Sequence, residues 1–320
     1  MVTIKDIAKA CNVSVSTASR ALRDEGYVSK EIKEKIHEAS RRLGYVANYS
    51  AKRLKSNQSK GIGVIISDIN NIFYNIYLEK LLFKFRQKGY SVNIMYSFED
   101  SNMERENFLT LLSFRVEAIL FIPTTDTNRD LVDLAIKNNI LLLQLFRKAY
   151  DDIGSITVDD AFGSYLATKY LIGLGCRNIS LLSIDIKNTP NRSNGYIQAH
   201  QEHKLKFNKD NIYKFHPNEN ITSEVRKIIL NKNPDGIIAG TNTFGMSVIS
   251  AVKLLPEAYK NIKIVSFDDV NWFELLDITT VVQPIDDIYI ESYNYIVSRL
   301  NKKTIMPAHL VVTPSLSVRS

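Results

Sequence analysis

The chain of 320 residues is long enough for two or three domains, and its 45% content of hydrophobic residues can fill their cores. No stretch approaches the roughly 18 consecutive apolar residues of a transmembrane helix. The N-terminus, MVTIKDIAKA, lacks the apolar segment of a secretory signal, and Cys11 and Cys176 cannot form a disulfide framework. These features predict a cytoplasmic protein without membrane contact.

Basic residues are concentrated at the N-terminal end. Residues 1–60 contain 13 Lys and Arg against 6 Asp and Glu, so the whole net charge of +7 lies there, and the remaining residues are balanced with 28 of each sign. Such asymmetry indicates a module for nucleic acid or for an anionic membrane surface, attached to a neutral body. Charge alone leaves a basic solubilising surface open as an equal alternative.

The first 46 residues predict three short helices. Thr3 followed by Asp6 has the pattern of a capping box at the start of the first helix. Ser14 can cap a second helix with the sequence VSTASRAL, and Ser29 can cap a third helix that ends at Gly44. The turn between the first two helices, NVSV, is short.

Two short helices joined by a tight turn are typical of a helix-turn-helix, with an ordinary three-helix bundle as the alternative. In a helix-turn-helix the second helix enters the major groove of DNA. Val15 and Ser16 at its start would then meet base edges, and Arg20 could reach a guanine or a phosphate. The basic charge of this segment favours the DNA-binding interpretation.

From residue 60 onward, strand-length apolar runs alternate with amphipathic helices. The runs GIGVIIS, YSVNIMY, EAILFIP and ILLLQLF are followed by a second series, which begins near residue 157 and contains NISLLS, DGIIAG and IKIVSFDD. Helices are expected at FYNIYLEKLLFKFRQKG and at about 102–114, 128–138, 160–174, 193–204 and 244–255. This alternation predicts two doubly wound α/β lobes with parallel sheets, and a ligand site in the cleft between them, beyond the carboxyl ends of the strands.

The motifs TIKDIA, VSVSTASR and LGY, followed by Asn48 and AKRL, resemble the headpiece of the LacI–GalR family of bacterial transcription repressors. GVIISDINNIFY, ITVDD, NRSNGY, IVSFDD and TTVVQP resemble the effector-binding core of that family, which shares its fold with periplasmic sugar-binding proteins. The resemblance covers essentially the full chain. It implies an all-α helix-turn-helix headpiece followed by a two-lobed, doubly wound α/β core.

The resemblance also implies the domain boundaries. The headpiece would span residues 1–46, a hinge helix and linker 47–58, and the effector-binding and dimerisation core 59–320. The first lobe would comprise about 59–157 and 286–308, with a helix at 287–300, and the second lobe about 158–285 and 309–320.

In the family, the hinge helix enters the minor groove and wedges a leucine into the central base step, and this leucine falls on Leu54. Arg23 and Ala47 depart from the family's usual Asn and Pro. The expected DNA-binding residues are Thr3, Ser14, Val15, Ser16, Thr17, Arg20, Tyr27, Asn48, Ser50, Lys52, Arg53, Leu54 and Lys55. The three basic hinge residues would neutralise phosphate, and the hinge would become helical only when two copies pair on DNA.

Candidate effector-binding residues follow the ends of the predicted strands. The expected set is Asp68, Asn70, Phe73, Tyr74, Thr124, Phe146, Arg192, Thr241, Asn242 and Asp268. Phe73 could equally begin the apolar stripe of its helix. The resemblance assigns effector contacts to Arg192 and Asp268. Because Phe146 and Asn242 stand where the family has Asp, the pocket is expected to be less acidic than usual, which hints at an effector carrying a carboxylate or phosphate.

No catalytic motif and no metal site is indicated. His200 and His203 have a spacing that can hold a metal, but their polar surroundings favour a solvated helix face. No Walker loop, nucleophile elbow or dinucleotide-binding motif occurs, so neither an enzyme nor a cofactor is expected.

The sequence is therefore interpreted as a homodimeric repressor of a carbohydrate-use operon. Its expected partners are a near-palindromic operator DNA and a sugar, sugar acid or sugar phosphate effector. The alternative is a cytoplasmic sugar-binding protein or sugar-processing enzyme whose basic headpiece is an accessory.

Overall fold

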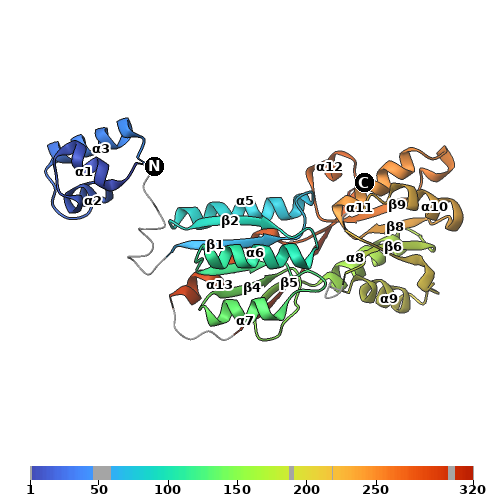
Figure 1. Cartoon of the computed structure of the whole chain (residues 1–320). Coiled ribbons are helices and arrows are strands. Elements are labelled where there is room, and N and C mark those ends of the chain that lie inside the picture. Colours follow the sequence, from blue (N-terminus) through green and yellow to red (C-terminus); the bar gives the residue numbers. More distant parts are fainter. Residues whose placement is uncertain (1, 46–58, 187–190, 218, 302–306, 320) are drawn as a thin grey trace. The chain divides into compact units, whose positions relative to one another are not determined.

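The computed structural model describes residues 2–45, 59–186, 191–217, 219–301 and 307–319 (Figure 1). The chain divides into two compact units, Met1–Ser59 and Lys60–Ser320. Within the described ranges, no helix has both the length and the apolar character needed to cross a membrane.

The N-terminal unit is built from three helices, as the capping pattern predicts. They are α1 (Ile4–Cys11), α2 (Val15–Arg23) and α3 (Lys30–Leu43). Asn12, Asp24 and Gly44 end the helices in the left-handed conformation, which turns the chain sharply at each of these points. The small core is formed by Ile7, Ala8, Cys11, Ala18, Ala21, Ile36 and Ala39, which are all buried.

The first lobe of the second unit is a parallel sheet with the strand order β2-β1-β3-β4-β5-β11. The strands are β1 (Gly61–Ile66), β2 (Ser91–Tyr96), β3 (Ala118–Phe121), β4 (Leu141–Leu145), β5 (Gly154–Val158) and β11 (His309–Val312). The helices α5 (Ile72–Gln87) and α13 (Ile285–Leu300) pack on one face, and α6 (Ser101–Ser113) and α7 (Arg129–Lys137) on the other.

The apolar stripe predicted on α5 is the face that packs on this sheet. Phe73, Tyr77, Leu81 and Phe85 are all at most 3% exposed. The hydroxyl of Tyr77 donates a hydrogen bond to Oγ of Ser292 on α13 at 3.0 Å. The stripe therefore also joins α5 to a helix more than 200 residues away in the sequence.

The second lobe repeats this topology, with the strand order β7-β6-β8-β9-β10-β12. Its strands are β6 (Ile179–Ile184), β7 (Ile212–Phe215), β8 (Gly236–Ala239), β9 (Lys263–Phe267), β10 (Thr279–Val282) and β12 (Ser315–Ser317), of which only β12 is antiparallel to its neighbour in the described sheet. Its helices are α8 (Asp160–Gly173), α9 (Arg192–Glu202), α10 (Thr222–Lys232), α11 (Asn242–Lys253) and α12 (Asn271–Leu275), with 3-10 turns at Lys209–Asn211 and Glu257–Tyr259.

Two features of this arrangement differ from the sequence expectation. Several elements have no counterpart among the predicted ones, namely β5, β7, β10, β11, β12, α10 and α12. The strand β7, for example, is a half-exposed edge strand without a continuous apolar run. The expected lobe boundary at residue 308 is wrong for residues 309–312. These residues form β11, which pairs in parallel with β5 of the first sheet, so the chain crosses to the second lobe only at Thr313 and Pro314.

Candidate functional site

The second helix of the N-terminal unit presents several of the predicted DNA-binding side chains to solvent. Ser16 and Arg20 are exposed, and Val15 is 43% exposed although it is apolar. Tyr27, which follows α2, is 94% exposed. An apolar residue and an arginine on one exposed helical surface can contact a thymine methyl group and a guanine edge or phosphate, respectively.

Three other predicted DNA-binding residues hold the ends of the helices. The backbone N–H of Thr17 donates to Ser14 Oγ at 3.0 Å, and the Thr3 backbone N–H donates to Asp6 Oδ2 at 2.8 Å. Thr3 and Ser14 remain at the surface, where these bonds orient them. The hinge candidates Asn48, Ser50, Lys52, Arg53, Leu54 and Lys55 lie outside the described residues.

The second unit contains a cavity between its two lobes, at the carboxyl ends of the strands. Its inner part has a volume of about 50 Å³. Both sheets contribute side chains at this edge, as expected for doubly wound folds. The lining includes Ser67, Asp68, Asn71, Phe73, Tyr74, Glu99, Phe146, Arg147, Asp160, Arg192, Thr241, Thr243, Asp268 and Gln283.

Asp268 is the centre of the polar network in this inner cavity. It follows β9 with a φ of 67°, a left-handed conformation that non-glycine residues adopt mainly where the surroundings impose it. Its Oδ2 accepts hydrogen bonds from the backbone N–H and from Nδ2 of Asn242, at 3.1 and 2.8 Å, and Gln283 Nε2 donates to Oδ1. Asn242 Nδ2 also donates to Asn71 Oδ1 at 2.7 Å, which links the second lobe directly to the first.

Arg192 begins α9 and is buried in the second lobe. Its Nη2 and Nε donate to Asp160 Oδ1 at 2.8 and 3.0 Å, and its Nη1 donates to the carbonyl oxygen of Gly240. The guanidinium carbon lies 4.1 Å from the centre of the Phe267 ring, a cation–π contact. The expected effector-binding arginine therefore lines the cavity with its charge already paired.

Arg147 forms the equivalent pair in the first lobe. Its Nη1 and Nη2 donate to the two carboxylate oxygens of Glu99 at 2.8 and 2.7 Å, and Nη1 also donates to the carbonyl oxygen of Pro123 at 3.2 Å. The two side chains are only 4% and 2% exposed. Both arginines of the lining are thus neutralised by buried carboxylates.

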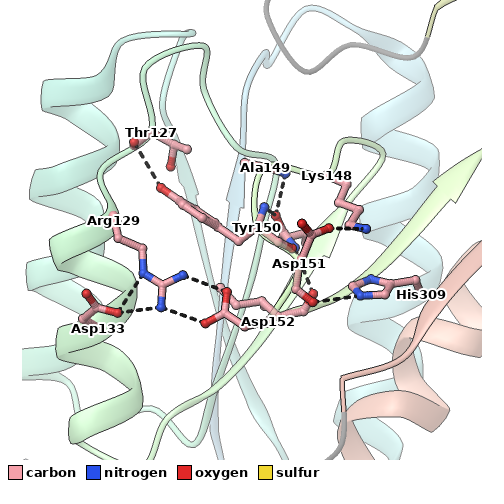
Figure 2. A network of polar contacts seen from close by, with 11 residues as sticks. Thr127, Arg129, Asp133, Lys148, Ala149, Tyr150, Asp151, Asp152 and His309 are labelled. Carbon is pink, nitrogen blue, oxygen red and sulfur yellow. Dashed lines mark hydrogen bonds and ion pairs between the residues drawn. The ribbon is translucent and has the colours of Figure 1, made fainter.

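The loop between β4 and β5, which carries Arg147 into the site, is fixed by polar contacts (Figure 2). Arg129 forms a bidentate pair with Asp152 of this loop at 2.7 Å, and its guanidinium lies over the ring of Tyr150. His309 Nε2 donates to the carbonyl oxygen of Asp151 at 3.0 Å. Contacts from α7 and β11 therefore hold the loop that positions the first-lobe arginine.

Aromatic rings form the first-lobe wall of the cavity. Phe146 has a φ of 62° and its ring lies 5.2–5.3 Å from the rings of Phe73, Tyr74 and Tyr77. Phe73 belongs to the apolar core, as its place in the stripe of α5 predicts, and it also borders the cavity. The wall offers apolar ring faces to a ligand.

Three of the expected residues, Thr124, Asn70 and Asn242, do not line the inner cavity. Thr124 is fully buried behind it, where its Oγ1 donates to Glu104 Oε2 at 2.9 Å, because the end of β3 turns toward α6. Asn70 is exposed, and its side chain lines a neighbouring outer cavity. Asn242 reaches the site through its contacts with Asp268 and Asn71.

The structure adds residues to the site that the strand-end argument omitted. Glu99 follows β2, Asn71 caps α5, Asp160 begins α8 and Gln283 follows β10. Asp160 and Gln283 lie within the motifs ITVDD and VVQP, so their positions beside strand ends could have identified them. Glu99 offered no comparable signal, because its role depends on a pairing with Arg147 across 48 positions.

The buried carboxyl group of Glu104 should make the stability of the protein depend on pH. Burial raises the pKa of Glu104, against hydrogen bonds from Thr127 and Thr124 that lower it. A carboxyl whose pKa is higher in the folded than in the unfolded state stabilises the protein below its unfolded pKa, and this contribution is lost as pH rises through the folded pKa. Glu104→Gln should therefore remove a loss of stability that the unsubstituted protein shows as pH rises toward neutrality. Urea unfolding of both proteins between about pH 4 and pH 8 measures this difference.

Glu106→Gln, at an exposed position of the same helix, is the matched control and should leave the pH profile unchanged. If the free energy of unfolding changes with pH in the same way for the unsubstituted protein and for Glu104→Gln, then Glu104 is not the titrating group.

A three-helix unit with an exposed second helix, together with a two-lobed α/β unit whose cavity lies at the strand ends, is typical of a ligand-responsive DNA-binding protein. Residues 3–48 match the family described as bacterial regulatory proteins, lacI family, and residues 59–292 match the periplasmic binding proteins and sugar binding domain of LacI family. The chain belongs to the LacI family.

Several known proteins of similar sequence are repressors. The sucrose operon repressor of Lactococcus lactis subsp. lactis is 28% identical over 293 residues, which cover 90% of each chain. The ribose operon repressor of Halalkalibacterium halodurans is 28% identical over 329 residues, which cover 100% of this chain and 96% of that one. A crystal structure of the lac repressor dimer bound to operator has a similar fold, with a TM-score of 0.80 at 20% identity and coverage of 99% and 98%.

Proposed function

We propose that this LacI-family regulator represses an operon for carbohydrate use, and that a sugar bound between the lobes controls its binding to DNA. The observation that carries the proposal is the inner cavity, where hydroxyl, amide and carboxylate groups from both sheets surround an aromatic wall. Such a lining matches the alternating hydroxyls and C–H faces of a sugar ring. The sucrose and ribose operon repressors among its relatives support this class of effector.

The charges of the cavity favour a neutral sugar over a sugar acid or phosphate. Four carboxylates line it, and the two guanidinium groups are already paired with two of them, Glu99 and Asp160. We therefore propose a neutral sugar in place of the anionic effector that Phe146 and Asn242 indicated. An added anion would lie near Asp68 and Asp268 without an unpaired cation in the described lining, which is unfavourable.

Burial raises the pKa of Asp68, with the nearby Glu99 carboxylate also raising it, and hydrogen bonds from the backbone N–H of Asn70 and Asn71 act in the opposite direction. A sugar hydroxyl that donates to this carboxylate would stabilise its ionised form.

In this proposal, sugar binding in the inner cavity is coupled to the conformation of the protein that binds DNA. One helix-turn-helix reads a half-site, so the proposed active species is a homodimer on a near-palindromic operator in the cytoplasm. A sugar that enters the inner cavity competes with the Asn71–Asn242 hydrogen bond and so changes how the lobes close on each other. The effector can act only through a difference in its affinity for the DNA-binding and released forms.

The test begins by selecting DNA that the full chain binds, and then measures binding to the selected site with and without each sugar of a panel. Removal of residues 1–59 should abolish DNA binding and leave sugar binding intact, because the two units have separate cores. Fluorescence anisotropy reports DNA binding and calorimetry reports sugar binding. Failure to select any DNA site would refute the regulator, and the binding-protein or enzyme alternative would then be favoured.

A further inference from the structure

A second, more open cavity lies beside the inner one. It has a volume of about 310 Å³ and shares Asp68, Pro217 and Thr243 with the inner cavity. Asn70 lines it from the first lobe, and Met246 and Ser250 line it from α11. The inner cavity therefore continues outward into a space that both lobes border.

The inner cavity is small for a ligand that extends beyond one ring. A cavity needs at least roughly 10–15 Å³ to hold one water molecule, so 50 Å³ corresponds to only a few waters. The Asn71–Asn242 hydrogen bond also crosses from one lobe to the other beside this cavity, so a sugar ring would have to displace it. Any further part of the ligand must extend into the outer cavity.

The chemistry of the outer cavity suits uncharged, hydroxyl-rich groups. Hydroxyl groups come from Ser247, Ser250, Thr222 and Thr243, and amides from Asn70 and Asn220. The carboxylates of Asp68 and Glu219 can accept hydrogen bonds from sugar hydroxyls, and Met246 offers an apolar surface to a C–H face. No Lys or Arg is present among the described residues that line it. A phosphate or carboxylate would thus find no cation here.

We propose that the effector is a neutral disaccharide or a similar glycoside, with one ring in the inner cavity and the second ring in this outer cavity. The proposal rests on the sugar-controlled function above and adds the size of the effector. Met246 and Ser250 are four residues apart on α11 and so face the same side of that helix. Together with Asn70 from the opposite lobe, they would hold the second ring across the mouth of the cleft.

The test compares single sugars with the disaccharides that contain them. Calorimetry with the full chain would measure the affinities of glucose, glucose 6-phosphate, cellobiose, maltose and sucrose. At least one disaccharide should bind about tenfold or more tightly than glucose, since the second ring adds several hydrogen bonds, and glucose 6-phosphate should bind no more tightly than glucose.

Ser250→Trp fills the outer cavity from an exposed position of α11. It should weaken disaccharide binding about tenfold or more and leave the affinity for glucose within a factor of about two. Asn70→Ala should also weaken disaccharide binding, because it removes a hydrogen-bonding group from the outer cavity without filling it. Ser113→Trp makes the same substitution at an exposed position of α6 away from both cavities and should change neither affinity.

The proposal is overturned if no disaccharide binds more tightly than glucose, or if Ser250→Trp weakens glucose and disaccharide equally. If a monosaccharide releases the selected DNA and no disaccharide binds, the proposed repressor function stands and the outer site is refuted. Loss of DNA binding under all conditions would instead count against the proposed function.

Discussion

Gly195→Ala is expected to destabilise the second lobe by about 3 kcal/mol or more, at the upper end of the range for overpacked positions. Gly195 lies on α9, where that helix crosses α8. A Cβ atom added there would lie 1.7 Å from the carbonyl oxygen of Ala161 and 2.6 Å from the backbone nitrogen of Tyr165. Both neighbours are backbone atoms, so no side chain can move aside and the two helices must separate.

The same separation would disturb the candidate effector site. Arg192 stands one turn before Gly195, and its partner Asp160 is next to Ala161, so the close crossing of the helices holds the Arg192–Asp160 pair together. Sugar binding should therefore weaken along with stability.

Gly173→Ala is the matched control. Gly173 ends α8, and an added Cβ would meet nothing within 4 Å. This substitution should leave stability unchanged or raise it by about 0.4–1 kcal/mol, because alanine restricts the unfolded chain. Urea unfolding, with the slope and midpoint fitted separately, compares the variants. Equal stability of Gly195→Ala and the unsubstituted protein would contradict the close crossing.

Arg147→Met is expected to destabilise the first lobe by about 3–5 kcal/mol, the range for breaking a buried ion pair. The substitution leaves Glu99 buried without its bidentate partner and also removes the contact with the Pro123 carbonyl. Methionine approximates the length of the aliphatic part of arginine, so the loss of stability reflects the removed charge more than a change in side-chain volume. Urea unfolding followed by far-ultraviolet circular dichroism provides the measurement.

Two further variants separate the charge from the packing. Arg147→Met combined with Glu99→Leu removes both charges and should recover a large part of the lost stability, because no unpaired ion remains. Arg105→Met breaks the exposed pair with Asp130 and should cost less than about 1 kcal/mol. If Arg147→Met is no more destabilising than Arg105→Met, the buried pair has no special role in the fold.

Much of the architecture was predictable because local patterns and burial agree. The spacing of Phe73, Tyr77, Leu81 and Phe85 predicts a helix with one buried face, and the structure confirms it. The edge strand β7 did not follow from its sequence, because its residues are only partly buried and its pairing with β6 is made across the fold.

The candidate site was predictable only in outline. Strand ends predicted that Asp68, Phe146 and Asp268 lie at one edge of the sheets, and all three line the cavity, because parallel strands deliver their carboxyl ends to one edge. Thr124 also follows a strand but contacts Glu104 behind the cavity. Position along the chain gives the edge of the sheet on which a residue lies, and it does not give the direction of its side chain.

The sequence by itself determined the three helices of the N-terminal unit, its basic charge, the two doubly wound lobes and the family of the chain. These follow from local capping, from hydrophobic periodicity and from motifs, all of which involve residues close together along the chain. The tertiary structure alone decided that Arg147 and Arg192 are neutralised by Glu99 and Asp160, and that β11 belongs to the first lobe. Those outcomes depend on contacts between residues 32 to 154 positions apart, whose geometry no local pattern encodes.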